Sequence, residues 1–213
     1  MELTPEQVRV LGCLVEKEAT TPDLYPLSTN ALVAACNQRS SRDPVVAYDE
    51  ATVTQTMLSL RERGLARTSR GEGSRVYKHA HGLREALGVD GAALAVLSVL
   101  MLRGAQTPGE LRTRTERQHE FPSLEAVEAT LQALARREEP LVAVLERLPG
   151  HKESRWMHLL AGEEGLAAAA AAIPVRSSAP AAGPGLAAEV AELREELAAL
   201  RERVELLESL LDA

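Results

Sequence analysis

The chain contains the apolar stretch Val10-Leu11-Gly12-Cys13-Leu14 and, much later, the similar stretch Val96-Leu97-Ser98-Val99-Leu100. Each is followed by a Thr-Pro pair, Thr21-Pro22 in the first case and Thr107-Pro108 in the second. Patterns for a helix, a second helix, a longer helix and a hairpin follow one another from residue 4 to about 81, and again from about 90 to 160. This duplicated order predicts two tandem winged helices, a mainly α fold with small β-hairpins.

Local signals place the helices of both copies. Thr4 with Gln7 and Thr107 with Glu110 have the spacing of capping boxes, and each is followed by a proline at the first helical position. Ser28, Asp49 and Ser123 are expected to cap three further helices, and Gly64 to end the third one. Matching apolar stripes mark the longer helices: Val53, Met57 and Leu60 in the first copy, Val127, Leu131 and Leu134 in the second.

A hairpin is predicted at the end of each copy. In the first, strands over 65–70 and 74–79 flank Gly71-Glu72-Gly73, whose glycines tolerate a positive φ. In the second, strands over 141–148 and 153–159 flank Pro149-Gly150-His151-Lys152. These hairpins are the two predicted wings.

The sequence divides into four segments: winged-helix domains at 1–82 and 83–160, an Ala/Pro/Gly-rich linker at 161–185 and a coiled-coil helix at 186–213. The linker contains one candidate short helix, 166–173. In the last segment Val or Leu residues recur at spacings that alternate between three and four, the pattern of a coiled coil, which favours a parallel homodimer. The alternative is a lone amphipathic helix that folds back on its own domains. The seam contains Val190, Leu193, Leu197, Leu200, Val204 and Leu207.

Composition limits the class of protein. The net charge is -7, but residues 1–82 carry 10 basic and 10 acidic side chains, residues 83–160 carry 10 and 11, and residues 161–213 carry 4 and 10. Both predicted domains are therefore nearly neutral, and only clustering could create a basic face. With no signal peptide and no membrane span expected, we predict a soluble cytoplasmic protein.

Neither a metal nor a cofactor is expected. Cys13 and Cys36 fall at apolar helical positions, which suits buried free thiols in a reducing compartment. A zinc site with His79 and His81 is the alternative, but the spacing matches no usual pattern. Phosphate-loop, HExxH and nucleophile-elbow patterns are missing from the sequence, so we expect a binding protein and not an enzyme.

Two clusters of cationic and polar residues could bind nucleic acid. The first copy has 31 residues from Pro22 to Val53 where the second has 19 from Pro108 to Val127, and the excess includes the polar run 37–44. Arginines and a lysine also surround the first predicted wing. The polar run could instead be a solvated loop, and the wing charges could simply protect a hairpin edge. The candidates are Asn37, Gln38, Arg39, Ser41, Arg42, Arg70, Arg75 and Lys78.

Other features oppose sequence-specific reading of DNA. The longer helices begin with acidic residues, Asp49-Glu50 in the first copy and Glu125 with Glu128 in the second, which would repel phosphates. The base contacts that remain on the first of these helices are Gln55, Thr56, Ser59 and Arg63. Two functions stay open: binding of double-stranded DNA, as in a transcriptional regulator, or a protein-interaction adaptor.

Several long motifs carry a family resemblance over residues 3–160: Leu11-Gly12-Cys13-Leu14-Val15-Glu16-Lys17-Glu18, Ala35-Cys36-Asn37-Gln38-Arg39-Ser40-Ser41-Arg42-Asp43-Pro44-Val45 and Leu102-Arg103-Gly104-Ala105-Gln106-Thr107-Pro108-Gly109-Glu110-Leu111-Arg112. The chain resembles the YceH-like family of uncharacterised bacterial proteins. The resemblance implies tandem winged-helix domains in a bacterial cytosolic protein. It does not indicate which activity the protein has. The linker and the heptad segment lie outside these motifs, so it does not support the dimer.

Overall fold

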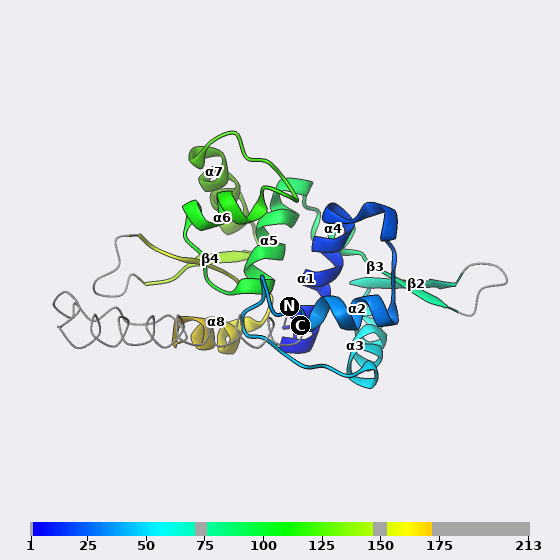
Figure 1. Cartoon of the computed structure of the whole chain (residues 1–213). Coiled ribbons are helices and arrows are strands. Elements are labelled where there is room, and N and C mark those ends of the chain that lie inside the picture. The colour runs from blue at the N-terminus through cyan, green and yellow to red at the C-terminus, as the bar shows by residue number, and fades with distance from the viewer. Residues whose placement is uncertain (1, 71–75, 147–152, 172–213) are drawn as a thin grey trace, which may run out of the picture. The chain divides into compact units, whose positions relative to one another are not determined.

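The computed structural model describes residues 2–70, 76–146 and 153–171. The described residues form one compact unit (Figure 1). The predicted coiled-coil helix, most of the predicted linker, Arg75 and both hairpin turns lie outside the described residues. Within the described residues the chain forms eight α-helices and five short strands in two antiparallel sheets, which confirms a mixed α and β class.

The first half of the unit contains three helices and a small sheet. Helices α1 (Pro5–Thr20), α2 (Thr29–Cys36) and α3 (Glu50–Glu62) are followed by the hairpin of β2 (Ala66–Arg70) and β3 (Tyr77–His81). A short strand, β1 (Leu27–Ser28), follows the 3-10 turn Pro22–Leu24 and pairs with β3, so the strand order is β1-β3-β2. We call residues 2–82 the first repeat.

The second half has the same order of elements. After α4 (Leu83–Leu87) come α5 (Gly91–Arg103), α6 (Pro108–Thr115), α7 (Leu124–Ala135) and the hairpin of β4 (Val142–Val144) with β5 (Trp156–His158). A single bridge pairs Gln106 with Trp156, just as β1 pairs with β3 in the first repeat. We call residues 83–160 the second repeat. No helix in the described ranges is both long and apolar enough to cross a membrane.

The predicted helix starts are confirmed. In both capping boxes the threonine accepts a hydrogen bond from the N3 amide, and the N3 side chain accepts one from the threonine amide. Ser28, Asp49 and Ser123 cap α2, α3 and α7 through their side-chain oxygens. Gly64 follows the end of α3 with a φ of 71°. These starts were predictable because a cap is satisfied within one turn of the chain.

The predicted match between Thr21 and Thr107 was wrong. Thr107 caps α6 directly after the Gln106 bridge, so its counterpart is Ser28, which caps α2 directly after β1.

The short helix predicted over 166–173 is confirmed in part. The structure has α8 (Gly162–Ala171), which begins four residues earlier, and residues 172 and 173 lie outside the described residues. The alanine run of α8 has high helix propensity.

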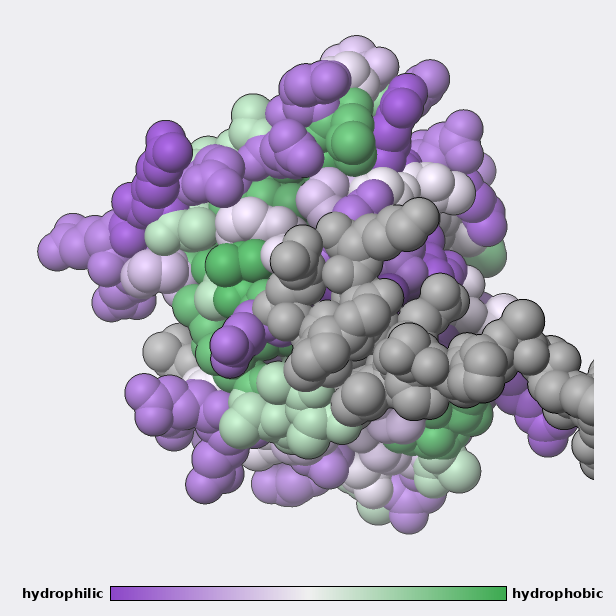
Figure 2. All heavy atoms as spheres, turned by 90° about the vertical axis from the view of Figure 1, so that its left-hand side faces the viewer, coloured by the Kyte–Doolittle hydropathy of each residue, from purple (hydrophilic) through white to green (hydrophobic). Residues whose placement is uncertain are grey.

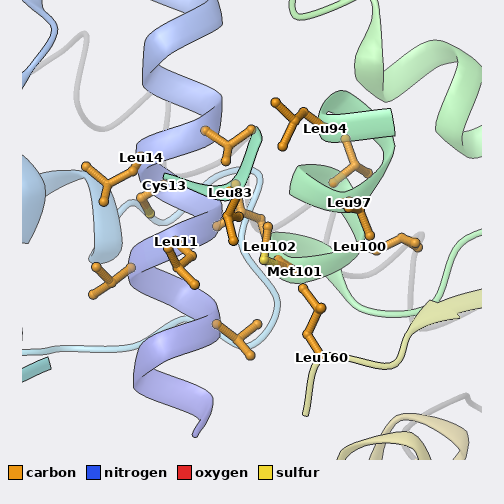
Figure 3. Close-up of a cluster of buried hydrophobic side chains, with 14 of the residues drawn as sticks. Leu11, Cys13, Leu14, Leu83, Leu94, Leu97, Leu100, Met101, Leu102 and Leu160 are labelled. Carbon is orange, nitrogen blue, oxygen red and sulfur yellow. The ribbon is translucent and has the colours of Figure 1, made fainter. Parts of the chain in front are cut away.

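The core joins the two repeats through α1 and α5. Every residue from Gln7 to Val15 and from Ala93 to Leu102 is buried, so these stretches of the two helices are covered on all sides. Their apolar side chains form one cluster that includes Leu11, Leu97 and Leu100 (Figure 3). Cys13 and Cys36 are buried free thiols, as predicted.

Gly12 makes the contact between α1 and α5 close. A Cβ at this position would lie 2.9 Å from Leu102 Cγ and 3.1 Å from Met101 Cβ. In addition, Ser98 Oγ donates a hydrogen bond to the Gly12 carbonyl at 3.4 Å. A side chain at position 12 would therefore push the two repeats apart.

We expect Gly12→Ala to lower the free energy of unfolding by about 1–2 kcal/mol, measured by urea denaturation. Overpacking costs about 1–3 kcal/mol, and the better helix propensity of alanine returns up to about 1 kcal/mol. Gly91→Ala is the matched control, because a Cβ there meets nothing within 4 Å. Equal stability of the two variants would contradict the close contact.

Candidate functional site

The polar run predicted to contact nucleic acid forms the connection between α2 and α3. At its start, Asn37 pairs with the backbone of Tyr48 at its far end: Asn37 Nδ2 donates to Tyr48 O at 2.7 Å, and Tyr48 N donates to Asn37 Oδ1 at 2.8 Å. Tyr48 also packs against the core. The amide of Asn37 therefore closes the loop and does not face solvent as a free donor.

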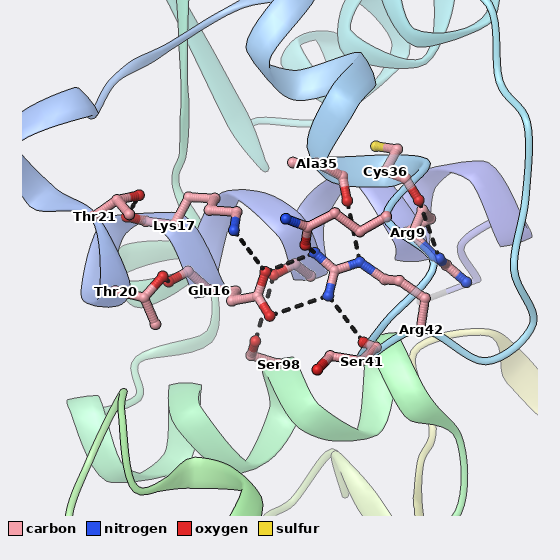
Figure 4. Close-up of polar contacts among 12 residues, drawn as sticks. Arg9, Glu16, Lys17, Thr20, Thr21, Ala35, Cys36, Ser41, Arg42 and Ser98 are labelled. Carbon is pink, nitrogen blue, oxygen red and sulfur yellow. Dashed lines mark hydrogen bonds and ion pairs between the residues drawn. The ribbon is translucent and has the colours of Figure 1, made fainter. Parts of the chain in front are cut away.

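Arg42, predicted as a contact to nucleic acid, is buried, and its side chain is 0% exposed. Its guanidinium pairs with the Glu16 carboxylate through two hydrogen bonds, of 2.6 and 3.1 Å. The remaining N–H groups donate to Ala35 O, Ser41 O and Gln38 Oε1, so all five donors are used (Figure 4). Burial alone would lower the pKa of Arg42, but the hydrogen bonds and charge of Glu16 raise it.

The loop also connects the two repeats. Ser41, with a φ of 61°, accepts a hydrogen bond from Arg103 at the end of α5. The Asp43 amide donates to Leu102 O at 2.8 Å. Of the five predicted residues in the run, Asn37, Gln38, Ser41 and Arg42 thus make contacts within the protein. Arg39 is exposed and has no side-chain partner among the described residues.

The first hairpin carries the other predicted cations. Arg70 and Lys78 are exposed, and the Arg70 guanidinium lies 5.9 Å from the centre of the Tyr77 ring. Arg67 is also exposed and lies 3.7 Å from the Glu85 carboxylate, a surface pair that contributes little. The predicted cations that are exposed are thus Arg39, Arg70 and Lys78, and we call these three the exposed basic set.

The two histidines of the rejected zinc alternative point inward. His79 lies between the hydroxyls of Thr29 and Thr68, at 2.9 and 3.1 Å, and burial lowers its pKa. His81 Nε2 contacts Glu18 at 2.9 Å, and its Nδ1 accepts from the Leu83 amide. Within the described ranges no group of three His, Cys, Asp or Glu side chains is placed to hold a metal ion.

Three of the four residues suggested as base contacts on α3 make hydrogen bonds within the protein. The Thr56 hydroxyl donates to Thr52 O, and Ser59 accepts from Gln7 on α1. Arg63 donates to Glu2 O and to Gln7 Oε1. The fourth, Gln55, is exposed and has no side-chain hydrogen bond within the described structure.

The acidic residues at the start of α3, Asp49 and Glu50, disfavour contact of this helix with DNA. Hydrogen bonding from Thr52 lowers the pKa of Asp49, and hydrogen bonding from Ser123 lowers the pKa of Glu125 at the start of α7. Both carboxylates are therefore charged at neutral pH. They stabilise the helix starts but repel phosphate groups.

A pocket of about 630 Å³, which no sequence pattern predicts, lies between the repeats. Its walls come from α1, the 41–48 loop, the end of α5, β5 and α8, segments that are far apart in the sequence. Five arginines line it: Arg9, Arg42, Arg103, Arg114 and Arg155. Arg155 pairs with Glu110 at 2.6 and 3.1 Å; burial raises the pKa of Glu110, but hydrogen bonds from Arg155 and from the Thr107 backbone lower it overall.

Comparison with known proteins places the chain in a family. Residues 3–151 match the family described as "Protein of unknown function, DUF480". The chain belongs to the DUF480 family. Curated relatives agree: a UPF0502 protein of Azoarcus sp. (strain BH72) is 49% identical over 211 residues, 99% of this chain and 92% of its own length. The YceH-like resemblance predicted from the motifs is consistent with this membership.

Other relatives differ in how much of the chain they match. A UPF0502 protein of Vibrio parahaemolyticus is 47% identical over 212 residues, 97% of this chain and 98% of its own length. One of Geobacter metallireducens is 56% identical over 156 residues, 73% of this chain and 71% of its own length. The DUF480 match ends at residue 151, yet the Azoarcus and Vibrio relatives align well beyond it.

Arg39 and Arg42 provide a direct test of the loop. Arg42→Ala is expected to lower the free energy of unfolding by about 3–5 kcal/mol, because the largely buried Glu16 carboxylate loses both short hydrogen bonds and keeps only the longer ion pair with Lys17, at 3.5 Å. Arg39→Ala, three residues away and exposed, should change it by less than about 0.5 kcal/mol. Urea denaturation of both variants measures the difference, and similar stabilities would refute the structural role of Arg42.

Proposed function

We propose that this DUF480 chain is a non-enzymatic tandem winged-helix protein that binds double-stranded DNA, the activity expected of a transcriptional regulator. The observation that carries the proposal is the exposed basic set of the first repeat, Arg39, Arg70 and Lys78. None of the three has an ion-pair partner among the described residues. Cations that are not neutralised within the protein are available to phosphates.

The order of elements supports this proposal. In each repeat two helices precede a longer helix and a hairpin, as in a helix-turn-helix with a wing. In the first repeat the hairpin is the longer of the two, with five residues in each strand against three. We accordingly assign domains to residues 1–82 and 83–160, with the first as the main contact to DNA.

The charge pattern indicates how the DNA would be bound. The start of α3 is acidic, whereas the basic set lies on the hairpin and at the end of α2. Contacts through a wing and a helix end reach the phosphate backbone more readily than base edges in the major groove. The binding should therefore depend strongly on salt and weakly on sequence.

The test is fluorescence anisotropy with a labelled random-sequence duplex over about 20–200 mM salt. Arg70→Gln/Lys78→Gln should reduce the affinity and lower the slope of log affinity against log salt by about 2, one unit for each lost phosphate contact. The control Arg84→Gln/Arg136→Gln removes the same charge from two exposed positions away from the basic set. Equal losses in both variants would refute this site, and no binding at the lowest salt would refute DNA binding itself.

The second candidate function is a protein-interaction adaptor. It is favoured by the acidic start of α3 and by exposed apolar side chains on the first hairpin, where Tyr77 is 54% and Val76 50% exposed. A dimer through the heptad segment would present two such surfaces and so raise the avidity for a partner.

The same segment gives a test of oligomeric state. The full chain is expected to sediment as a dimer, and a chain that lacks residues 186–213 as a monomer, because the Val and Leu seam would no longer be available. Analytical ultracentrifugation measures both. Identical sedimentation behaviour as monomers would refute the coiled-coil dimer in either functional model.

A further inference from the structure

The pocket between the repeats has the size and composition of a small-molecule site. Its volume of about 630 Å³ lies within the range usual for ligand pockets, roughly 300–1,000 Å³. Apolar wall comes from both repeats, through Val8 on α1, Leu100 and Met101 on α5, and Met157 on β5. Ala168 and Ala169 of α8 close one side. Figure 2 shows the left-hand side of Figure 1, where hydrophobic surface lies between hydrophilic side chains.

The pocket has an excess of positive charge. Five arginines line it, against the two carboxylates of Asp43 and Glu110. Arg42 is neutralised by Glu16 outside the lining, while Arg155 and Arg114 share Glu110 at 2.6 and 3.8 Å. Arg9 and Arg103 have no carboxylate partner in the described part of the chain.

Arg9 is an unusual buried cation. It is 4% exposed, and among the described residues it donates to two backbone carbonyls and to no carboxylate: Cys36 O at 3.2 Å and Pro44 O at 2.5 Å. A buried guanidinium is normally paired with an anion, because removal of its charge from water is costly. The site therefore stabilises Arg9 incompletely, and a bound anion would complete it.

Arg103 lies on the second repeat, and it too lacks a carboxylate partner among the described residues. Its one hydrogen-bond partner among the described residues is the Ser41 hydroxyl, a neutral group. Burial and the positive charge of Arg114 lower its pKa; Glu16 acts in the opposite direction, and Arg42 adds a smaller lowering. An anion would relieve this repulsion.

Two neutral side chains in the lining have unused hydrogen-bonding capacity. Gln106 Oε1 and His158 Nδ1 are buried without a partner, and they are two of three such atoms in the described structure. His158 is 2% exposed, and burial lowers its pKa to about 4, so its ring is neutral at physiological pH. Both residues line the pocket, but the two unpaired atoms are themselves buried, so the charge of the arginines and not these atoms makes the pocket suited to an anion.

We propose that this pocket binds a small organic anion, a carboxylate or a phosphate ester of metabolite size, with Arg9 and Arg103 as its charge partners. Because Arg9 belongs to the first repeat and Arg103 to the second, the ligand contacts both. An anion that accepts the Arg103 hydrogen bond in place of the Ser41 hydroxyl breaks one of the hydrogen bonds between the 41–48 loop and α5. The pocket is thus an effector site at the junction of the repeats, and it is separate from the exposed basic set.

The protein contains its own reporter for this site. Trp156 is the one tryptophan in the sequence, and its neighbours Arg155 and Met157 line the pocket. We would titrate the full-length protein with pyrophosphate, citrate and inorganic phosphate at constant ionic strength, following Trp156 fluorescence and repeating each titration by calorimetry. Constant ionic strength, set with sodium chloride, separates specific binding from screening.

Saturable binding of pyrophosphate or citrate is expected, with a dissociation constant below about 1 mM. Tighter binding of pyrophosphate indicates a phosphate ester as the ligand, and tighter binding of citrate a carboxylate; either supports the proposal. No saturation by any of the three anions up to about 10 mM would overturn it.

Variants locate the binding. Arg103→Gln keeps a donor for Ser41 but loses the charge, and it should weaken binding at least about tenfold, as charge-assisted contacts do. Arg9→Gln should do the same; if it does not fold, Arg103→Gln decides, since Arg103 is only partly buried. Arg84→Gln is the control, and Arg70→Gln/Lys78→Gln should bind the anion normally even if DNA binding fails. Unchanged affinity in Arg103→Gln would refute the site.

Discussion

The close packing of α1 against α5 is the constraint on which the rest of the described structure depends. It requires a residue without a side chain at Gly12, because Leu102 and Met101 occupy the space that a Cβ would need. At this contact the central turns of α1 and most of α5 are buried, and the two repeats share one core. The hairpins consequently extend to opposite sides of the unit (Figure 1), and the space beside the contact becomes the pocket.

A second constraint acts on the longer connection of the first repeat. Glu16 on α1 binds Arg42, which in turn holds carbonyls at the end of α2 and in the loop. The loop then reaches α5 through Ser41 and Asp43. A role in joining the repeats and forming a pocket wall therefore explains the extra residues of the first repeat. Of the two arginines in this connection, Arg39 is the exposed one.

Local signals in the sequence predicted the fold better than the site. Caps at Thr4, Asp49 and Thr107 involve residues within one turn, so their chemistry could be recognised without tertiary structure. The direction of a side chain could not be recognised in this way. Arg39 and Arg42 are three residues apart in one polar run, yet the side chain of Arg39 is exposed and that of Arg42 is fully buried. The pocket was missed because its walls meet only after the repeats pack. One signal was present, since Arg9 lies between Val8 and Val10 on a helix that is otherwise apolar there.

The cations of the first hairpin and those of the pocket differ in their exposure to solvent, and they are therefore suited to different ligands. Charges on the first hairpin are exposed to solvent, so their attraction to phosphates falls steeply with salt and acts over about 10 Å at 0.1 M. Arg9 and Arg103 are buried or partly buried, where screening is weaker and geometry selects the ligand. An anion in the pocket changes the contacts of Arg103 with the loop whose first residues include Arg39. The loop is thus the physical connection through which occupancy of the pocket could alter the exposed basic set.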